Sequence, residues 1–243
     1  MPPIRAISTG GIVSVFGTAF APPGTARQVS GADLVGGRLP TNMDHVCVEM
    51  GTKRAYMLHI FPNQINVQVP QLTVGEEVAL RVVRNCGLPQ EVKSQPRMLM
   101  VKAATPEFFY LQHKPGGHNP LVAVNPTTYQ LYGEPGSFGD VKLVKAKPGD
   151  MVDFYTTGFG KTSPLVPPGD IPGYAAETVA RPVVTVGGTA VPEAEVLYCG
   201  VTQWAGVYLL RIKVPAVGAG HHAVVVRFGE DVSPSGGYLA VGP

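Results

Sequence analysis

The sequence has little charge, a single tryptophan and no long apolar run. Only 15% of its 243 residues are charged, which leaves few residues for the solvated faces of amphipathic helices. No apolar run of about 18 residues occurs, so we expect no membrane-spanning helix. The first residues, MPPIRAIS, lack the basic start and apolar core of a signal peptide. We therefore expect any export signal to lie outside this sequence.

The sequence also lacks a basic cluster. Its formal net charge is only +2, and its lysines and arginines are scattered along the chain. Proteins that bind nucleic acids concentrate basic residues on one face, because they must neutralise phosphates. The charge pattern therefore excludes nucleic acid as an expected partner.

Motifs of the common enzyme classes are missing as well. Gly160-Lys161-Thr162 matches the end of a phosphate-binding loop, but Tyr155 stands where the pattern needs glycine. The prolines that follow exclude the helix that this loop requires. No G-x-S-x-G motif and no arrangement of a cysteine with a histidine indicates a nucleophile. We predict a protein that is not an enzyme, with no catalytic residues and no cofactor.

Histidines offer only a weak candidate for a metal site. His113 and His118 lie on either side of the turn KPGG. Zinc or copper needs about three or four converging ligands, and no cysteine or carboxylate pattern accompanies this pair. We predict no metal site, with His113 and His118 as the weak candidates and exposed turn histidines as the alternative.

The three cysteines are Cys47, Cys86 and Cys199, an odd number that cannot be fully paired within one chain. Cys47 and Cys86 lie in the first half of the chain, in or just after runs that read as strands. If the protein is secreted, these two can form a disulfide. The alternative is a pair of small buried hydrophobic residues.

The sequence does contain 30 glycines and 24 prolines, which lie as turn signals between short runs of alternating apolar and polar residues. The run FPNQINVQVP, residues 61–70, has an echo about 145 residues later in GVYLLRIKVP, residues 206–215. Both alternate with the period of a half-buried strand. Their apolar sides, which we expect to face a core, are Ile65, Val67 and Val69 in the first and Leu210, Ile212 and Val214 in the second.

Two copies of one strand suggest two copies of one domain. Each copy offers about six or seven short strands, the pattern of a small antiparallel β-sandwich. We predict an all-β fold with two tandem sandwiches, at residues 1–104 and 143–243. The stretch between them, residues 105–142, contains further alternating and aromatic runs. We interpret it as a β-hairpin insert, an extra hairpin or two packed against, or completing, one of the sandwiches, and expect a rigid junction.

The order of these segments closely resembles the repeated C-terminal module of large exported proteins of Solibacter-type Acidobacteria. The resemblance covers essentially the whole chain and is carried most clearly by residues 62–70, 147–160 and 206–215. It implies an immunoglobulin-like, TIG-like pair of β-sandwiches of unknown biochemical role, in proteins that are secreted or on the cell surface. The first strand of the pattern is reduced here to MPPIRAIS, which leaves a place that a strand of another chain could fill.

Aromatic residues give the main cue for binding. Trp204, Tyr208 and Tyr198 cluster around one predicted hairpin, and exposed rings stack on sugars or on protein partners. Our leading hypothesis is a non-catalytic structural or adhesive module that binds a protein partner or self-associates through sheet edges. The alternatives are a carbohydrate-binding module that recognises a polysaccharide through these rings, and an accessory domain of a secreted hydrolase.

Overall fold

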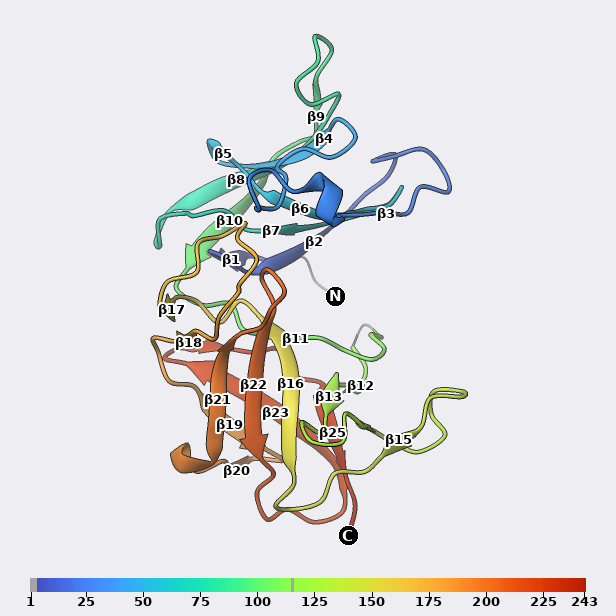
Figure 1. Cartoon of the computed structure of the whole chain (residues 1–243), viewed down its shortest axis with the longest axis vertical. Helices are drawn as coiled ribbons and strands as arrows, with labels where there is room; N and C mark the ends of the chain where they lie inside the picture. Colours follow the sequence, from blue (N-terminus) through green and yellow to red (C-terminus); the bar gives the residue numbers. More distant parts are fainter. Residues whose placement is uncertain (1–3, 115) are drawn as a thin grey trace.

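The structure, a computed structural model, describes residues 4–114 and 116–243. The described residues form four β-sheets and two short 3-10 helices, η1 (Gly31–Asp33) and η2 (Glu193–Glu195), and contain no α-helix. The expected all-β class is therefore confirmed. Figure 1 shows two sheets in the upper half of the molecule and two in the lower half, with the C-terminus at the lower end.

The first two sheets come from residues 6–102. A six-stranded sheet has the order β1-β10-β8-β4-β5, with β9 paired to β8, and a four-stranded sheet has the order β2-β7-β6-β3. The strands are β1 (Ala6–Ser8), β2 (Ile12–Phe16), β3 (Arg27–Gln28), β4 (Val46–Met50), β5 (Lys53–Arg54), β6 (Tyr56–Ile60), β7 (Gln64–Gln68), β8 (Glu77–Arg84), β9 (Val92–Lys93) and β10 (Arg97–Lys102).

The other two sheets come from residues 107–241. A nine-stranded sheet has the order β15-β14-β13-β16-β22-β21-β18-β17, with β11 paired to β16, and a six-stranded sheet has the order β12-β25-β23-β19-β20, with β24 paired to β23. The first strands of these two sheets are β11 (Glu107–Phe108), β12 (Asn119–Pro120), β13 (Ala123–Val124), β14 (Leu131–Tyr132), β15 (Leu143–Val144), β16 (Met151–Thr157), β17 (Thr162–Ser163) and β18 (Glu177–Thr178). The remaining strands are β19 (Val183–Val186), β20 (Thr189–Ala190), β21 (Val196–Val201), β22 (Tyr208–Lys213), β23 (Gly220–Phe228), β24 (Asp231–Val232) and β25 (Gly237–Val241).

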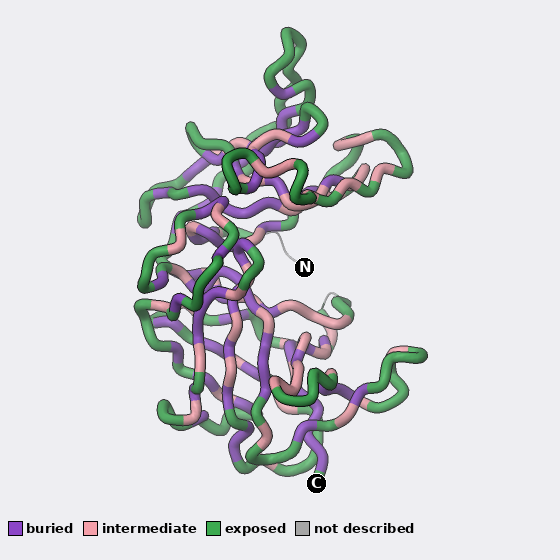
Figure 2. Tube along the Cα trace, in the orientation of Figure 1, coloured by how far each residue is buried: buried purple, intermediate pink, exposed green. Residues whose placement is uncertain are grey.

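Two large clusters of buried apolar side chains divide along the sequence. One draws on residues from Ile7 to Val101 and the other on residues from Ala104 to Val241. Figure 2 shows the buried positions running along the strands in both halves of the molecule, with the exposed positions mostly in the connecting loops. The six residues expected to face a core, three around β7 and three around β22, are all buried. The alternation that predicted these two strands is confirmed.

The N-terminal strand corrects one expectation. Ala6, Ile7 and Ser8 of β1 pair in parallel with Met100, Val101 and Lys102 of β10, after which the chain crosses to β2 in the other sheet. The place that we left for a strand of another chain is therefore taken by this chain's own β1.

Residues 105–142 are not separate from the second half of the chain, which is the arrangement expected if they complete a sandwich. A hairpin is present, since β13 pairs with β14 at Val124 and Leu131. However, β11 and β13 both pair with β16, and β12 pairs with β25. This segment is therefore built into the same two sheets as residues 143–243, and a boundary at 142 would cut through the nine-stranded sheet.

A loop of residues 160–174, called here the junction loop, reaches from the lower half onto the upper half. Gln68, at the end of β7 and only 5% exposed, accepts a hydrogen bond of 2.8 Å from the Gly169 amide through Oε1. Its Nε2 donates at 3.1 Å to the Gly10 carbonyl. Arg38 pairs with Asp170 at 2.6 Å and donates at 2.6 Å to the Pro168 carbonyl. These contacts anchor the loop to the first two sheets.

A second set of contacts passes through Thr157 at the end of β16. Its hydroxyl accepts a 2.8 Å hydrogen bond from the Ile12 amide and donates one of 2.8 Å to the Gly206 carbonyl. Gly206 has a φ of +77°, and a Cβ there would lie 2.7 Å from Ile12 Cγ1. Only glycine therefore lets the loop between β21 and β22 approach β2 this closely.

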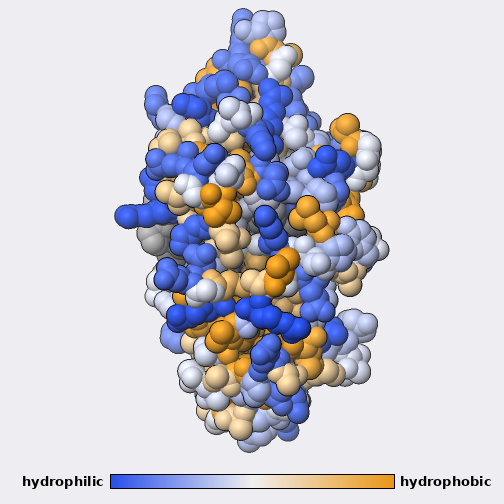
Figure 3. Space-filling view, turned by 90° about the vertical axis from the view of Figure 1, so that its left-hand side faces the viewer, coloured by the Kyte–Doolittle hydropathy of each residue, from blue (hydrophilic) through white to orange (hydrophobic). Residues whose placement is uncertain are grey.

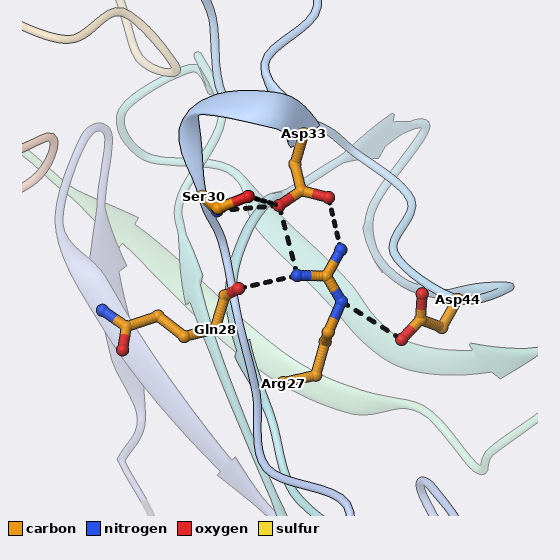
Figure 4. A network of polar contacts seen from close by, with 5 residues as sticks. All are labelled: Arg27, Gln28, Ser30, Asp33 and Asp44. Atoms are coloured by element: carbon orange, nitrogen blue, oxygen red, sulfur yellow. Dashed lines mark hydrogen bonds and ion pairs between the residues drawn. The ribbon is translucent and has the colours of Figure 1, made fainter.

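At the β3 edge of the four-stranded sheet, away from β2, a polar network holds the segment after β3 (Figure 4). The Arg27 guanidinium contacts both carboxylate oxygens of Asp33, donates at 2.8 Å to the Gln28 carbonyl and lies 3.4 Å from Asp44. The Ser30 amide and hydroxyl also donate to Asp33. The hydrogen bonds from Arg27, and then those from Ser30, hold the pKa of the Asp33 carboxyl below its usual range. This network orders a segment that has little regular secondary structure.

Candidate functional site

A shallow, open depression of about 360 Å³ lies on the outer face of the nine-stranded sheet. We call it the Trp204 depression. Its floor comes from the neighbouring strands β16, β22 and β21, and one wall comes from the loop between β21 and β22. The lining includes Asp153, Tyr155, Tyr198, Trp204, Leu209 and Arg211.

Strand alternation explains why these residues share one face. In β22, Leu210 and Ile212 are fully buried in the core, so Leu209 and Arg211 point to the other side of the sheet. The register places Arg211 beside Asp153 of β16 and beside Tyr198 of β21. Tyr155 is opposite Leu209 in the same way. Three short local patterns thus converge on one surface.

Trp204 is held above this floor by its own loop. The Thr202 amide donates to the Val207 carbonyl at 3.0 Å, the Val207 amide donates to the Trp204 carbonyl at 3.1 Å, and the Trp204 amide donates to the Thr202 hydroxyl at 3.1 Å. The Trp204 residue is 52% exposed. Its ring centroid lies 5.9 Å from that of Tyr155, with 47° between the ring planes. The two rings therefore form a bent surface and not a flat one.

Arg211 and Asp153 form a paired, forked contact beside the rings. Arg211 Nε donates to Asp153 Oδ1 at 2.6 Å and its Nη2 donates to Oδ2 at 2.7 Å. This geometry is the stronger kind of ion pair, and the bonds to Asp153 raise the pKa of the Arg211 guanidinium. The guanidinium has five N–H donors, so Arg211, whose side chain is 36% exposed, keeps free donors for a ligand, whereas only 9% of the Asp153 side chain is accessible.

The three aromatic residues singled out in the sequence do not stay together. Trp204 and Tyr198 line the depression, and the Tyr198 hydroxyl donates at 2.8 Å to the Val201 carbonyl. Tyr208 is buried on the opposite face of β22, where its hydroxyl donates at 2.6 Å to the Gly160 carbonyl. Burial raises the pKa of the Tyr208 phenol. Tyr208 therefore supports the junction loop and is not available to a ligand in the depression.

Sequence reasoning missed Tyr155, Asp153 and Arg211. The alternation in DMVDFYTT was a usable signal, because it places Asp153 and Tyr155 on the same side of one strand. The pairing of Asp153 with Arg211, 58 residues away, had no local signal, because it depends on which strands become neighbours.

The two histidines named as weak metal candidates lie in different aromatic surroundings. The His113 ring is 5.4 Å from that of Tyr110, and the His118 ring is 5.8 Å from that of Tyr238. Within residues 4–114 and 116–243, no group of three or more histidine, cysteine or acidic side chains is placed to hold a metal ion. We therefore assign no metal site to them.

The cysteines are placed as follows. Cys47 and Cys86 are joined by a disulfide, with sulfurs 2.08 Å apart and a sequence separation of 39. Both are buried with Val83 in a small cluster of their own. Cys199 is a free, buried cysteine, and burial raises the pKa of its thiol to about 12. Its thiol is therefore protonated at neutral pH and is a poor nucleophile.

A second cavity, of about 30 Å³, lies at the junction and is lined by residues such as Gly10, Gln68, Gly160 and Tyr208. Its size fits a water molecule and nothing larger.

On the face drawn in Figure 3, apolar side chains are interrupted by hydrophilic ones and form no continuous apolar area. Among the described residues, no helix is long and apolar enough to cross a membrane.

Comparisons with known proteins leave the family open: no protein-family model and no curated protein matches the chain. One similar solved structure is SGBP-B of the Bacteroides ovatus mixed-linkage glucan utilization locus, in complex with a mixed-linkage heptasaccharide. It is 8% identical, with a TM-score of 0.38, over 98% of this chain and 43% of that chain. The chain thus spans less than half of that protein.

Another similar structure contains the fibronectin(III)-like modules of Clostridium thermocellum CbhA. It is 12% identical, with a TM-score of 0.23, over 99% of this chain and 91% of that chain. Identities and TM-scores this low carry no argument about function, which has to come from the chain's own geometry.

Proposed function

We propose that the chain is a non-catalytic structural and adhesive module of an exported or cell-surface bacterial protein, built from two immunoglobulin-like sandwiches. The observation that carries this proposal is the junction. Two separate apolar cores, each between two sheets, are joined through the hydrogen bonds that Gln68 accepts from the Gly169 amide and Thr157 accepts from the Ile12 amide. A domain pair with such a junction holds its two ends in one orientation, which suits a spacer or a presenting scaffold. The division between the sandwiches then falls near residue 103.

Small-angle X-ray scattering from the isolated chain tests the fixed orientation. We expect one arrangement of the two halves to fit the scattering curve. A curve that requires an ensemble of angles between them contradicts the proposal, because an unanchored pair cannot present a surface in a defined direction.

The disulfide supports the exported location, because disulfides persist in oxidising compartments and are rare in the cytosol. Chain produced in an oxidising compartment should expose one free thiol on denaturation, that of Cys199, and reduced chain should expose three. Reduction should lower the free energy of unfolding by about 2–4 kcal/mol. Equal stability of the two forms would argue against an exported protein that depends on this bond.

Self-association through sheet edges is the finer part of the proposal. One edge strand is β2: its Ile12 end is covered at the junction by Thr157, and its other end runs to Phe16, which is 72% exposed. Exposed edge strands are templates for pairing with another chain. Size-exclusion chromatography at high concentration should show dimers or larger species; a monomer at every concentration tested rules this part out.

A second candidate function is carbohydrate binding, which the Trp204 depression favours. Its exposed tryptophan, its neighbouring tyrosines and the forked ion pair combine an apolar stacking surface with orienting polar groups. Such a combination is typical of sites for amphipathic small ligands. The accessory domain of a secreted hydrolase stays a prediction, and no particular contact favours it.

A further inference from the structure

The shape of the ring surface restricts which polysaccharide can bind, if carbohydrate binding is the function. Sugar rings stack with their C–H faces on aromatic rings, because both surfaces are apolar and flat. In crystalline cellulose the sugar rings of a chain lie close to one plane, so flat aromatic surfaces suit it. Trp204 and Tyr155 are in contact but inclined by 47°. They match a chain whose successive sugar rings are inclined to one another.

The polar groups of the depression restrict the charge of the ligand. Asp153 and Arg211 neutralise each other through two hydrogen bonds. A carboxylated or sulfated chain therefore gains no net attraction here, and it also meets the carboxylate of Asp153. Hydroxyl groups, in contrast, can both donate to Asp153 and accept from the remaining guanidinium N–H groups. The amide of Gln203 lies at the rim and adds the same dual capacity.

The site is also ordered before any ligand arrives. Five hydrogen bonds within residues 202–207 hold the Trp204 loop, and the Gly206 carbonyl accepts a bond from Thr157 at the junction. Gly206 packs against Ile12 of the other half. Binding therefore costs little additional ordering of the protein, which favours affinity.

The depression is open, so a chain can continue beyond it instead of ending in it. We infer that the Trp204 depression binds the interior of a neutral polysaccharide chain with a helical course, with Trp204 and Tyr155 stacking on successive sugar rings and the Arg211–Asp153 pair hydrogen-bonding to their hydroxyl groups. This inference rests on the carbohydrate-binding candidate and names its ligand class and contact residues.

Affinity electrophoresis and fluorescence titration of the full chain test the inference. The probes are laminarin and amylose, two neutral helical glucans, with microcrystalline cellulose as the flat chain and polygalacturonate as the anionic one. We expect binding to at least one of the first two and none to the last two. Trp204 is the only tryptophan, so the bound glucan should shift the fluorescence emission of the wild-type chain without any substitution.

Three variants locate the site. Trp204→Ala and Tyr155→Ala should each weaken glucan binding by about tenfold or more, the loss expected for a central aromatic contact. Trp204→Phe should retain part of the affinity, and it replaces the alanine variant if that variant unfolds at a lower temperature. The matched control is Phe16→Ala, which removes an exposed ring from the other half and should leave binding unchanged.

The outcomes distinguish a failure of the carbohydrate-binding candidate from a failure of the proposed site or ligand class. If none of the four polysaccharides binds, the carbohydrate-binding candidate falls together with the inference. If a glucan binds but the tryptophan emission stays constant and Trp204→Ala binds equally well, carbohydrate binding stands and this site is overturned. If cellulose or polygalacturonate binds as strongly as the helical glucans, the proposed ligand class is overturned.

Discussion

Gln68 joins two backbone groups that are far apart in the sequence, at Gly10 and Gly169. Its side chain bonds the Gly10 carbonyl and the Gly169 amide, both on buried residues. A buried backbone group without a partner costs about 1–3 kcal/mol. The side chain therefore acts as a polar link inside the junction, although it lies on the side of β7 opposite to the core residues Ile65 and Val67.

Replacing Gln68 by methionine keeps the length of the side chain but removes both hydrogen bonds. We expect Gln68→Met to lower the free energy of unfolding by about 2–4 kcal/mol, measured by urea denaturation. Gln64→Met is the control in the same strand, because Gln64 bonds only the Asn66 side chain through its amide. That variant should change stability by less than about 1 kcal/mol. Similar losses in both variants would contradict the role assigned to Gln68.

Glu107 is a carboxylate in a costly position. It accepts hydrogen bonds from the Tyr110 hydroxyl at 2.7 Å and from the Phe108 amide at 3.0 Å. Burial nevertheless raises the pKa of the Glu107 carboxyl above its ordinary value of 4.5. The folded chain thus holds this proton more tightly than the unfolded chain, and folding is most favoured when the carboxyl is protonated.

The sign of the pH effect follows from that pKa. The contribution of Glu107 to stability is fully present below pH 4.5 and is lost as the pH rises through the higher pKa of the folded chain. Glu107→Gln keeps an acceptor for both hydrogen bonds and carries no charge, so we expect it to be more stable than wild type at pH 7. The difference should shrink on acidification in urea unfolding experiments. A glutamine variant less stable than wild type at pH 7 would refute this reading.

At the scale of elements, the two related strands β7 and β22 both have an apolar inner face, but their outer faces have different surroundings. Both bury their alternate apolar residues in a core. The outer face of β7 ends at Gln68 in the junction, whereas the outer face of β22 carries Leu209 and Arg211 into the Trp204 depression. The junction loop belongs to the second half of the chain but packs against Gln68 and Arg38 of the first half.

Gly169 in the junction loop offers a test of this element. Its φ is +90°, and a Cβ would lie 2.3 Å from Cε1 of Tyr56. Gly169→Ala should therefore push the loop off the first half and destabilise the chain by about 1–3 kcal/mol. Gly173→Ala, in the same loop, meets no atom within 4 Å and should be nearly neutral. Thermal unfolding of the two variants gives the comparison, and equal midpoints would show that the loop does not need this approach.

At the scale of the whole molecule, residues 104–142 belong with the second half. Phe108, Leu121, Ala123 and Tyr132 are buried in the core cluster of that half. The strands of this segment also pair with β16 and β25. A chain that starts at residue 143 would therefore lack part of its core and leave β16 with an open edge.

Two fragments test this division. We expect residues 104–243 to fold alone, because they contain every strand of their two sheets, and residues 143–243 to fail. Circular dichroism with thermal melting should show a cooperative transition for the longer fragment only. Cooperative folding of the shorter fragment would mean that residues 104–142 only pack against a complete sandwich, the other arrangement that the sequence left open.

Local patterns were enough to predict the all-β class, the buried sides of β7 and β22 and a pairing option for Cys47 and Cys86. Each of these depends on residues close in sequence, or on the residue type itself, because alternation along one strand directly sets which side is apolar. The exposure of Trp204 could also be expected, because the residue lies at the turn of a predicted hairpin. The same alternation places Tyr208 on the core side with Leu210 and Ile212, and this signal separates it from Trp204.

Long-range contacts decided the remaining features. Arg211 meets Asp153 because β22 and β16 are neighbours in register, and Gln68 is buried because the junction loop returns to β7. The place beside β10 is taken by β1 for the same kind of reason. Such pairings are chosen by the total burial and hydrogen bonding of the folded chain, so no short stretch of sequence contains them. The candidate site lies where three such strands meet, and it therefore became visible only in the tertiary structure.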